Sequence, residues 1–233
     1  MTGVQTCALP ISTKQVLASL TAGIFTPNGI GEYAGKAMFY DKSKTKTIVF
    51  LNLICNGIQM LITIFFGTIG LLILGYYKVG GLIIFLILIS FIVLLCLKSI
   101  SIKGYSVVFL KRKINELPKK IHHKNIAFGL LRYLIFTHQF YLLFVIFGVT
   151  LPYFQLIASK SCIYFLSSSL PSFQFLDFAV KGSVAVYYLG KLGVNEWLIV
   201  IVTTLMWLLN VVIPIVIGSI YVLNFKIPKP SAP

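Results

Sequence analysis

The sequence predicts an all-α, polytopic integral membrane protein, and three observations support this fold class. Of the 233 residues, 58% are hydrophobic and only 11% are charged, whereas a water-soluble domain carries about 25% charged residues. The mean hydropathy of +0.95 excludes intrinsic disorder, because a disordered chain needs low hydrophobicity. Several apolar segments also reach the length of about 20 residues that a helix needs to cross the hydrocarbon core.

The segments that are long and apolar enough to span a membrane are residues 48–75, 80–97, 126–149 and 196–224. The last two-thirds of the chain also contain two shorter apolar segments, residues 153–168 and 176–190, with Pro171 between them. Residues 14–24 resemble the end of one further helix. All of these segments belong to one transmembrane domain at 12–225, which we expect to be a fragment of a larger domain and to precede a C-terminal tail at 226–233.

Residues 1–11 do not fit the rest of the chain. They lack the basic and apolar regions of a signal peptide, and the string from Met1 to Ile11 resembles the conceptual translation of a widely used sequencing adapter. We therefore expect residues 1–11 to be a non-native artefact and the gene to lack part of its N-terminus. A native, short and polar N-terminus is the alternative.

Charged residues indicate the topology and exclude one class of partner. Basic residues outnumber acidic residues by 20 to 5, giving a formal net charge of +15. They gather before residue 48 and in the loop at 98–125, while Lys78 stands alone between the first two spans. The positive-inside rule therefore places both basic groups in the cytoplasm and the connection near residues 190–196 outside, in a multi-pass protein of the plasma (inner) membrane. Nucleic acid is excluded as a partner, because no soluble basic face exists.

The loop at 98–125 and the four cysteines are also consistent with a membrane protein. Apolar residues among the lysines of the loop indicate an amphipathic segment that lies on the inner leaflet. The four cysteines stand singly, without the spacing of a metal site, so we expect no metal, no cofactor and no disulfide.

Two near-copies of one pattern contain two of the five acidic residues. The first is Glu32–Ala37 behind Pro27, and the second is Asp177–Gly182 behind Pro171. Each has the order acid, aromatic, Ala, any residue, Lys, small residue, so the acid and the lysine lie one helical turn apart. Polar stripes follow on the long segments, with Asn52, Asn56 and Gln59 in the first copy and Thr203, Trp207, Asn210 and Pro214 in the second. The pattern predicts two related halves.

The expected topology makes these halves inverted with respect to one another. A motif helix of about 14 residues reaches only ~21 Å, which is too short to cross the membrane. We therefore expect two re-entrant half-helices whose proline ends lie near the midplane, as in transporters with inverted repeats. The N–H groups at such helix ends attract anions.

The ionisable residues of the motifs form the predicted ligand site. Three bases, Lys36, Lys181 and Arg132, and two acids, Glu32 and Asp177, are expected at membrane depth, which gives a net formal charge of +1 there. An anionic phospholipid headgroup or a lipid-linked phosphate suits this charge. In the alternative interpretation, the acid–lysine pairs only neutralise each other during insertion and Arg132 snorkels to the interface.

Five more residues are candidates for ligand binding. Gly29 and Gly31 would let the backbone approach a ligand closely. Asn52, Asn56 and Asn210 are the stripe residues that could reach it, although polar stripes in membranes more often pack helices together.

The first motif resembles that of a known family. Residues Phe25–Glu32, with the sequence Phe-Thr-Pro-Asn-Gly-Ile-Gly-Glu, are similar to the Thr-Pro-Gly-x-x-Gly-Glu signature of the flippase-like membrane family. This family includes the transmembrane region of lysylphosphatidylglycerol synthases and the YbhN-like proteins. Lys36, the second motif and the ending Trp207–Gly218 also fit, so the resemblance covers most of residues 15–224. Asn28 in place of glycine and Asp177 in place of glutamate depart from it.

The resemblance implies a lipid flippase or transporter-like protein that binds an anionic headgroup at a midplane site. Because no aminoacyl-transferring domain follows in the sequence, it argues against the synthase reaction. Two alternatives stay open. One is a membrane-embedded transferase acting on a lipid-linked substrate, with Glu32 or Asp177 as its base, and the other is an accessory subunit of a separately encoded transferase. No nucleophile–base pair or nucleotide loop supports an enzyme, so no catalytic residue is predicted.

Overall fold

The computed structural model describes residues 13–24, 26, 29–40, 43, 45–96, 101–102, 105–106, 112, 114–170 and 173–224. The predictions for residues 1–11 and for the tail at 226–233 lie outside these residues. So do Pro27, Asn28 and Pro171, together with much of the loop at 98–125 and hence its predicted amphipathic character.

Helices form almost all of the described chain. They are α1 (Thr13–Gly23), α2 (Gly31–Ala37), α3 (Thr45–Ile73), α4 (Tyr77–Cys96), α6 (Lys119–Ile146), α7 (Tyr153–Ser169), α8 (Asp177–Gly190), α9 (Glu196–Trp207) and α10 (Ile213–Leu223). A 3-10 turn, Gln174–Leu176, leads into α8, and a π-helical turn, Leu208–Val212, joins α9 to α10. Two strands of two residues each, β1 (Ser101–Ile102) and β2 (Tyr105–Ser106), pair antiparallel with Ser101 opposite Ser106.

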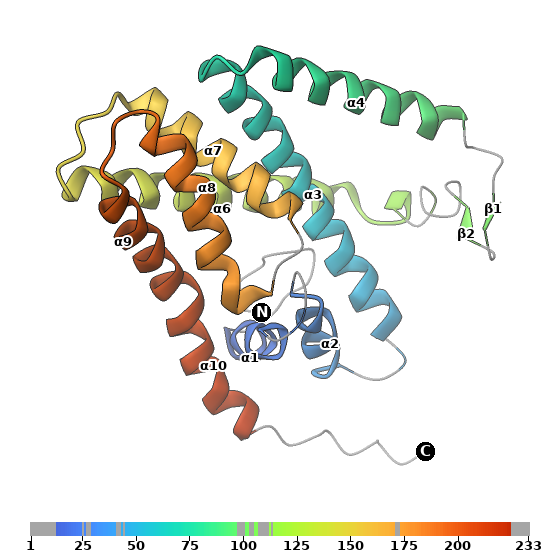
Figure 1. The fold of residues 1–233 in the computed structure, drawn as a ribbon. Helices are drawn as coiled ribbons and strands as arrows, with labels where there is room; N and C mark the ends of the chain where they lie inside the picture. The colour runs from blue at the N-terminus through green and yellow to red at the C-terminus, as the bar shows by residue number, and fades with distance from the viewer. Residues whose placement is uncertain are drawn as a thin grey trace.

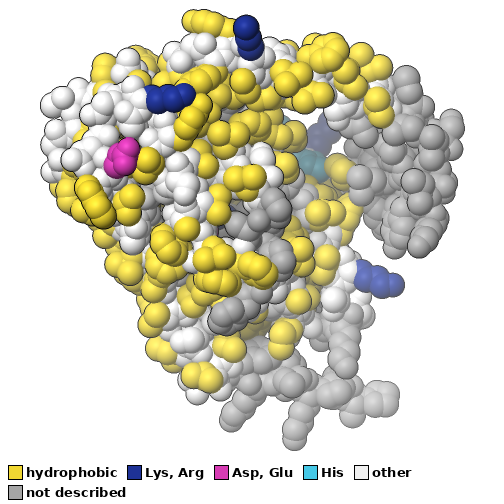
Figure 2. All heavy atoms as spheres, in the orientation of Figure 1, with side chains coloured by type: hydrophobic (Ala, Val, Ile, Leu, Met, Phe, Trp, Pro, Cys, Tyr) yellow, Lys and Arg dark blue, Asp and Glu magenta, His cyan; other side chains and the backbone are white. Residues whose placement is uncertain are grey.

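Three helices are long and apolar enough to cross a membrane, namely Thr45–Ile73, Lys119–Ile146 and Glu196–Leu223. Each coincides with a predicted span, so the chain is a helical membrane protein. The predicted span at 80–97 is also a helix, α4, but its apolar stretch Tyr77–Val93 is shorter than the other three. Hydrophobic side chains cover much of the face in Figure 2, as is expected of surface that lies against lipid.

The long helices run in opposite directions around a shared core. In Figure 1, α3 rises from the end near α2 toward α4, whereas α9 and α10 descend from the end near α8 toward the C-terminus. Helices α7 and α8 lie between them, and α6 lies behind α7 and α8 in this view. The core draws on α3, α6, α7, α8 and α9, with Leu71, Phe140, Phe144, Leu156, Cys162, Leu189 and Ile199 among its fully buried side chains.

Glycines let the helix backbones approach closely at two contacts between distant parts of the chain. Helix α3 packs on α7, where a Cβ on Gly70 would lie only 2.7 Å from the carbonyl oxygen of Ala158. Helix α1 packs on α10, where a Cβ on Gly218 would lie 2.2 Å from the carbonyl oxygen of Leu17. Small residues at such interfaces are typical of helix packing in membranes, where van der Waals contact drives association.

The first motif helix is shorter than predicted. Helix α8 has the expected 14 residues, but α2 has only 7. The reason is a tight turn between α1 and α2, in which the hydroxyl of Thr26 donates to the carbonyl oxygen of Gly23 at 2.7 Å and accepts from the N–H of Gly31 at 2.8 Å. The residues expected to begin the helix are therefore used to reverse the chain.

The last residues of the loop predicted at 98–125 are helical, contrary to expectation. Helix α6 begins at Lys119, directly after Pro118, which has φ −55° and ψ 136°. Proline cannot continue a helix from the preceding residues but readily precedes the first turn of one. The lysines at 119, 120 and 124 thus lie on the first turns of α6 and not in the loop.

Candidate ligand site

The first acid–lysine pair is buried between α2 and α3. Lys36 Nζ lies 2.9 Å from Glu32 Oε1, and the Lys36 and Glu32 side chains are 7% and 26% exposed. The same ammonium group donates to Asn52 Oδ1 at 3.3 Å. Asn52, predicted as a ligand-binding residue, therefore positions Lys36 from the facing helix.

Asn56 also joins α3 to the first motif. Its side-chain N–H donates to the hydroxyl of Tyr33, the aromatic residue that follows Glu32. Asn52 and Asn56 lie one turn apart on α3 and both hold α2 in place. These two contacts join α2 to α3, as is expected of a polar stripe that packs helices together.

The two glycines of the first motif have different local roles. Gly29 is buried and has φ +67°, a conformation that L side chains rarely adopt. Gly31 packs against α1, because a Cβ there would lie 2.4 Å from the carbonyl oxygen of Ala22. Close contact with α1 explains Gly31 without a ligand.

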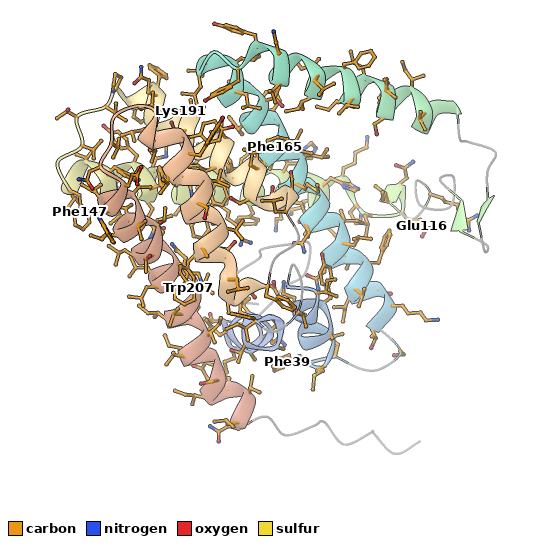
Figure 3. The ribbon with its side chains drawn as sticks, in the orientation of Figure 1. Phe39, Glu116, Phe147, Phe165, Lys191 and Trp207 are labelled. Carbon is orange, nitrogen blue, oxygen red and sulfur yellow. The ribbon has the colours of Figure 1, made fainter. Side chains whose placement is uncertain are left out.

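The second acid–lysine pair lies on α8. Lys181 Nζ donates to Asp177 Oδ2, and the two side chains are 31% and 20% exposed. The Lys181 ammonium group also lies 5.3 Å from the centre of the Tyr164 ring, which comes from α7. The aromatic residue after the acid, Phe178, contacts Trp207 with ring centres 5.0 Å apart, and Figure 3 shows Trp207 beside the lower end of α8.

Asn210 lies within the π-helical turn that joins α9 to α10. Its side-chain N–H donates to Gln139 Oε1 of α6 at 3.1 Å and to the carbonyl oxygen of Met206 at 2.8 Å. Pro214 lacks an N–H and stands shortly after this turn, which accounts for a local change in the hydrogen-bond pattern. Asn210 therefore connects two long helices.

Arg132 is not a member of either acid–lysine pair. It is exposed on α6, and its guanidinium group lies 5.6 Å from the ring of Phe136 on the same helix. Within the described residues, no hydrogen bond or ion pair connects Arg132 to Glu32 or Asp177.

A buried lysine that was not among the predicted site residues lies close to the second motif. Lys160 on α7 is 3% exposed, and its Nζ lies 3.6 Å from the centre of the Tyr164 ring and 4.7 Å from that of Phe140. The signal was present as Ser-Lys-Ser, which interrupts the apolar segment at 153–168. Among the described residues, Lys160 therefore joins Lys36 and Lys181 as a third lysine that is at least partly buried, beside the carboxylates of Glu32 and Asp177.

The ends of the two motifs approach each other at Gln174. A Cβ on Gly29 would lie 3.8 Å from Gln174 Oε1 and 4.0 Å from Glu32 Oε2. Gln174 Oε1 is buried and has no hydrogen-bond partner among the described residues. The turn before α8 therefore lies against the turn before α2.

Comparison with protein families, with curated proteins and with solved structures found no match for this chain.

Proposed function

We propose that this chain binds an anionic lipid headgroup within the plasma membrane and moves it between leaflets, as a member of the flippase-like family. The observation that carries the proposal is the pair of acid–lysine motifs, each on a short helix and joined to the other at Gln174. Ionisable residues inside a membrane protein are costly to place and mark binding sites or transport paths. The resemblance of Phe25–Glu32 to the family signature supports a lipid as the ligand.

An inverted repeat is part of this proposal, and the packing of the helices supports it. The helix before the first motif, α1, packs on the last helix of the second half, α10. The helix before the second motif, α7, packs on the long helix of the first half, α3. A pseudo-two-fold axis relates contacts in this reciprocal way, and an axis in the membrane plane requires the opposite directions that Figure 1 shows for α3 and α9.

Equivalent residues of the two copies also make equivalent contacts. Tyr33 contacts Asn56 and Phe178 contacts Trp207, so the aromatic residue of each motif meets the second stripe position of the following long helix. The third stripe positions, Gln59 and Asn210, both reach α6, where a Cβ on Gly129 would lie 3.6 Å from Gln59 Oε1.

The contact between the motifs supports the same proposed symmetry. Gly29 stands three residues before Glu32, and Gln174 stands three residues before Asp177. A residue that contacts its own equivalent lies at a two-fold axis. The proposed headgroup site lies at this axis, where α2 and α8 begin.

The multi-pass topology is tested by cysteine labelling. In a variant without the native cysteines, single cysteines at Ser106 and Asn195 are treated with a membrane-impermeant reagent. We expect labelling from outside at Asn195 only, because the basic residues near Ser106 keep that loop in the cytoplasm. External labelling at Ser106 and not at Asn195 would overturn the proposed orientation.

The headgroup site is tested by the double variant Glu32→Gln with Lys36→Gln, which removes both charges and leaves no lone ion in the interior. We expect binding of phosphatidylglycerol by the purified chain to weaken at least about tenfold, the effect of losing one strong polar contact of ~1.4 kcal/mol. The matched control replaces Arg112 and Glu116, an exposed pair with the same i, i+4 spacing, by glutamine.

Size-exclusion chromatography in detergent first checks that the double variant is folded and monodisperse. If a folded double variant still binds and moves the lipid as the parent does, the first acid–lysine pair is structural and the proposed site is wrong.

A further inference from the structure

Lys160 differs from the other interior lysines in what surrounds its charge. Lys36 and Lys181 each have a carboxylate of the same helix as a partner. Lys160 Nζ lies instead over two aromatic rings, and no carboxylate of the described chain forms an ion pair with it. Because an uncompensated buried charge is unfavourable, Lys160 does not stabilise the fold as an ion-paired lysine can, and a buried ionisable residue of this kind points to a functional role.

The Tyr164 ring places Lys160 next to the second motif. The ammonium group of Lys160 lies 3.6 Å from the centre of this ring, and that of Lys181 lies 5.3 Å from the same centre. Asp177 neutralises Lys181. With Lys160 protonated, the cluster formed by Lys160, Tyr164, Lys181 and Asp177 carries one excess positive charge, shared between α7 and α8.

Aromatic rings satisfy the charge of an ammonium group but only part of its hydrogen-bonding capacity. The ring face attracts the cation electrostatically, whereas the three N–H donors of a lysine bind oxygen acceptors more strongly, above all those of an anion. The long side chain of lysine also lets its ammonium group turn from the ring toward a ligand without movement of the helix.

The geometry points to Lys160 as the residue that binds the phosphate of the transported lipid, with a monoanionic phosphodiester as the class of ligand. One excess positive charge matches the single negative charge of a phosphodiester, while a phosphomonoester carries nearly two. A phosphate beside the Tyr164 ring is within reach of both Lys160 and Lys181, and Asp177 limits the site to one net charge. The inference rests on the proposed function and adds a residue, a location and a ligand class to it.

The test measures lipid binding by the full-length chain in detergent, using native mass spectrometry with phosphatidylglycerol, phosphatidylcholine and phosphatidic acid as probes. Lys160→Met replaces the charge with an apolar side chain of similar length, and Lys160→Arg retains it. Lys191→Met is the matched control, because Lys191 also stands one turn from a tyrosine, with Nζ 4.0 Å from the Tyr187 ring, but is exposed. Inorganic phosphate is added as a competitor, to separate a lipid site from a site for free phosphate.

We expect Lys160→Met to weaken phosphatidylglycerol binding by about tenfold or more, the loss of a charge-assisted contact. Lys160→Arg and Lys191→Met should stay within about twofold of the parent, on the same scale. The parent should prefer phosphatidylglycerol to phosphatidylcholine and to phosphatidic acid, and millimolar phosphate should compete poorly.

Two outcomes would overturn the inference. If Lys160→Met binds phosphatidylglycerol as the parent does, Lys160 does not bind the headgroup. The same result is expected if Lys160 only transfers protons. Strong competition by free phosphate means that the ligand is not a lipid. If Lys160→Met binds normally while the Glu32/Lys36 double variant does not, the inference fails and the proposed function stands.

Discussion

Replacing Lys36 by alanine is expected to destabilise the protein by about 3 kcal/mol, the lower end of the range for breaking a buried ion pair. Removing the ammonium group leaves Glu32, which is 26% exposed, without its partner at 2.9 Å. It also removes the hydrogen bond that Asn52 Oδ1 accepts from Lys36 Nζ at 3.3 Å. The measurement is the midpoint of thermal unfolding in detergent, compared with the parent.

Lys181→Ala serves as the comparison for this prediction, because it breaks the equivalent pair at a more open position. The Lys181 side chain is 31% exposed against 7% for Lys36, and Lys36 also donates to Asn52. Removing Lys181 therefore breaks a pair that is less shielded from solvent, and the loss should be smaller. Equal losses in the two variants would contradict the assignment of Lys36 to the interior. Restoration of stability when Glu32→Gln is added to Lys36→Ala would support it.

The variant Gly218→Ala should lose about 2 kcal/mol of stability, although alanine favours helix more than glycine does. A Cβ at this position would lie 2.2 Å from the carbonyl oxygen of Leu17 and 2.4 Å from the hydroxyl of Thr21. Since Leu17 contributes a backbone atom, α1 must move away from α10. That movement also weakens the hydrogen bond from the Thr21 hydroxyl to the carbonyl oxygen of Ile215.

Gly57→Ala is the matched control for Gly218→Ala. It is also a glycine within an apolar helix, but apart from its chain neighbours and its own helix backbone no atom lies within 4 Å of its would-be Cβ. It should gain stability by up to ~1 kcal/mol through helix propensity alone. The measurement is the midpoint of thermal unfolding of both variants. If Gly218→Ala is as stable as Gly57→Ala, α1 and α10 are not tightly packed.

The membrane helices were predictable because their signal is contiguous. Length and apolarity alone placed three of the spans, since the backbone in lipid must satisfy its hydrogen bonds within a helix. The span was predicted to begin at residue 126, whereas α6 begins at Lys119, because the lysines in its first turns are typical of a loop when only charge is considered. Pro118, which directly precedes the helix, indicates the true start.

The ionisable site was predictable only where the residues follow a local pattern. Acid and lysine at i and i+4 form pairs in the structure as the spacing predicts. Lys160 was missed because it is, like Arg132, a lone base in an apolar segment, and sequence does not reveal which side of a helix faces the core. The α6 face that bears Phe140 is buried whereas Arg132 is exposed, and this follows from the packing of α6 on α7.

The reciprocal packing of α1 on α10 and of α7 on α3 has a consequence for biogenesis. Helices enter the bilayer one after another as the ribosome delivers them, yet α1 has 11 residues and bonds through Thr21 to Ile215, 194 positions further along the chain. Its partner on α10 is therefore translated long after α1 itself. Helix α10 therefore fixes α1 in place only after the residues between them have been synthesised, so this part of the fold is completed late.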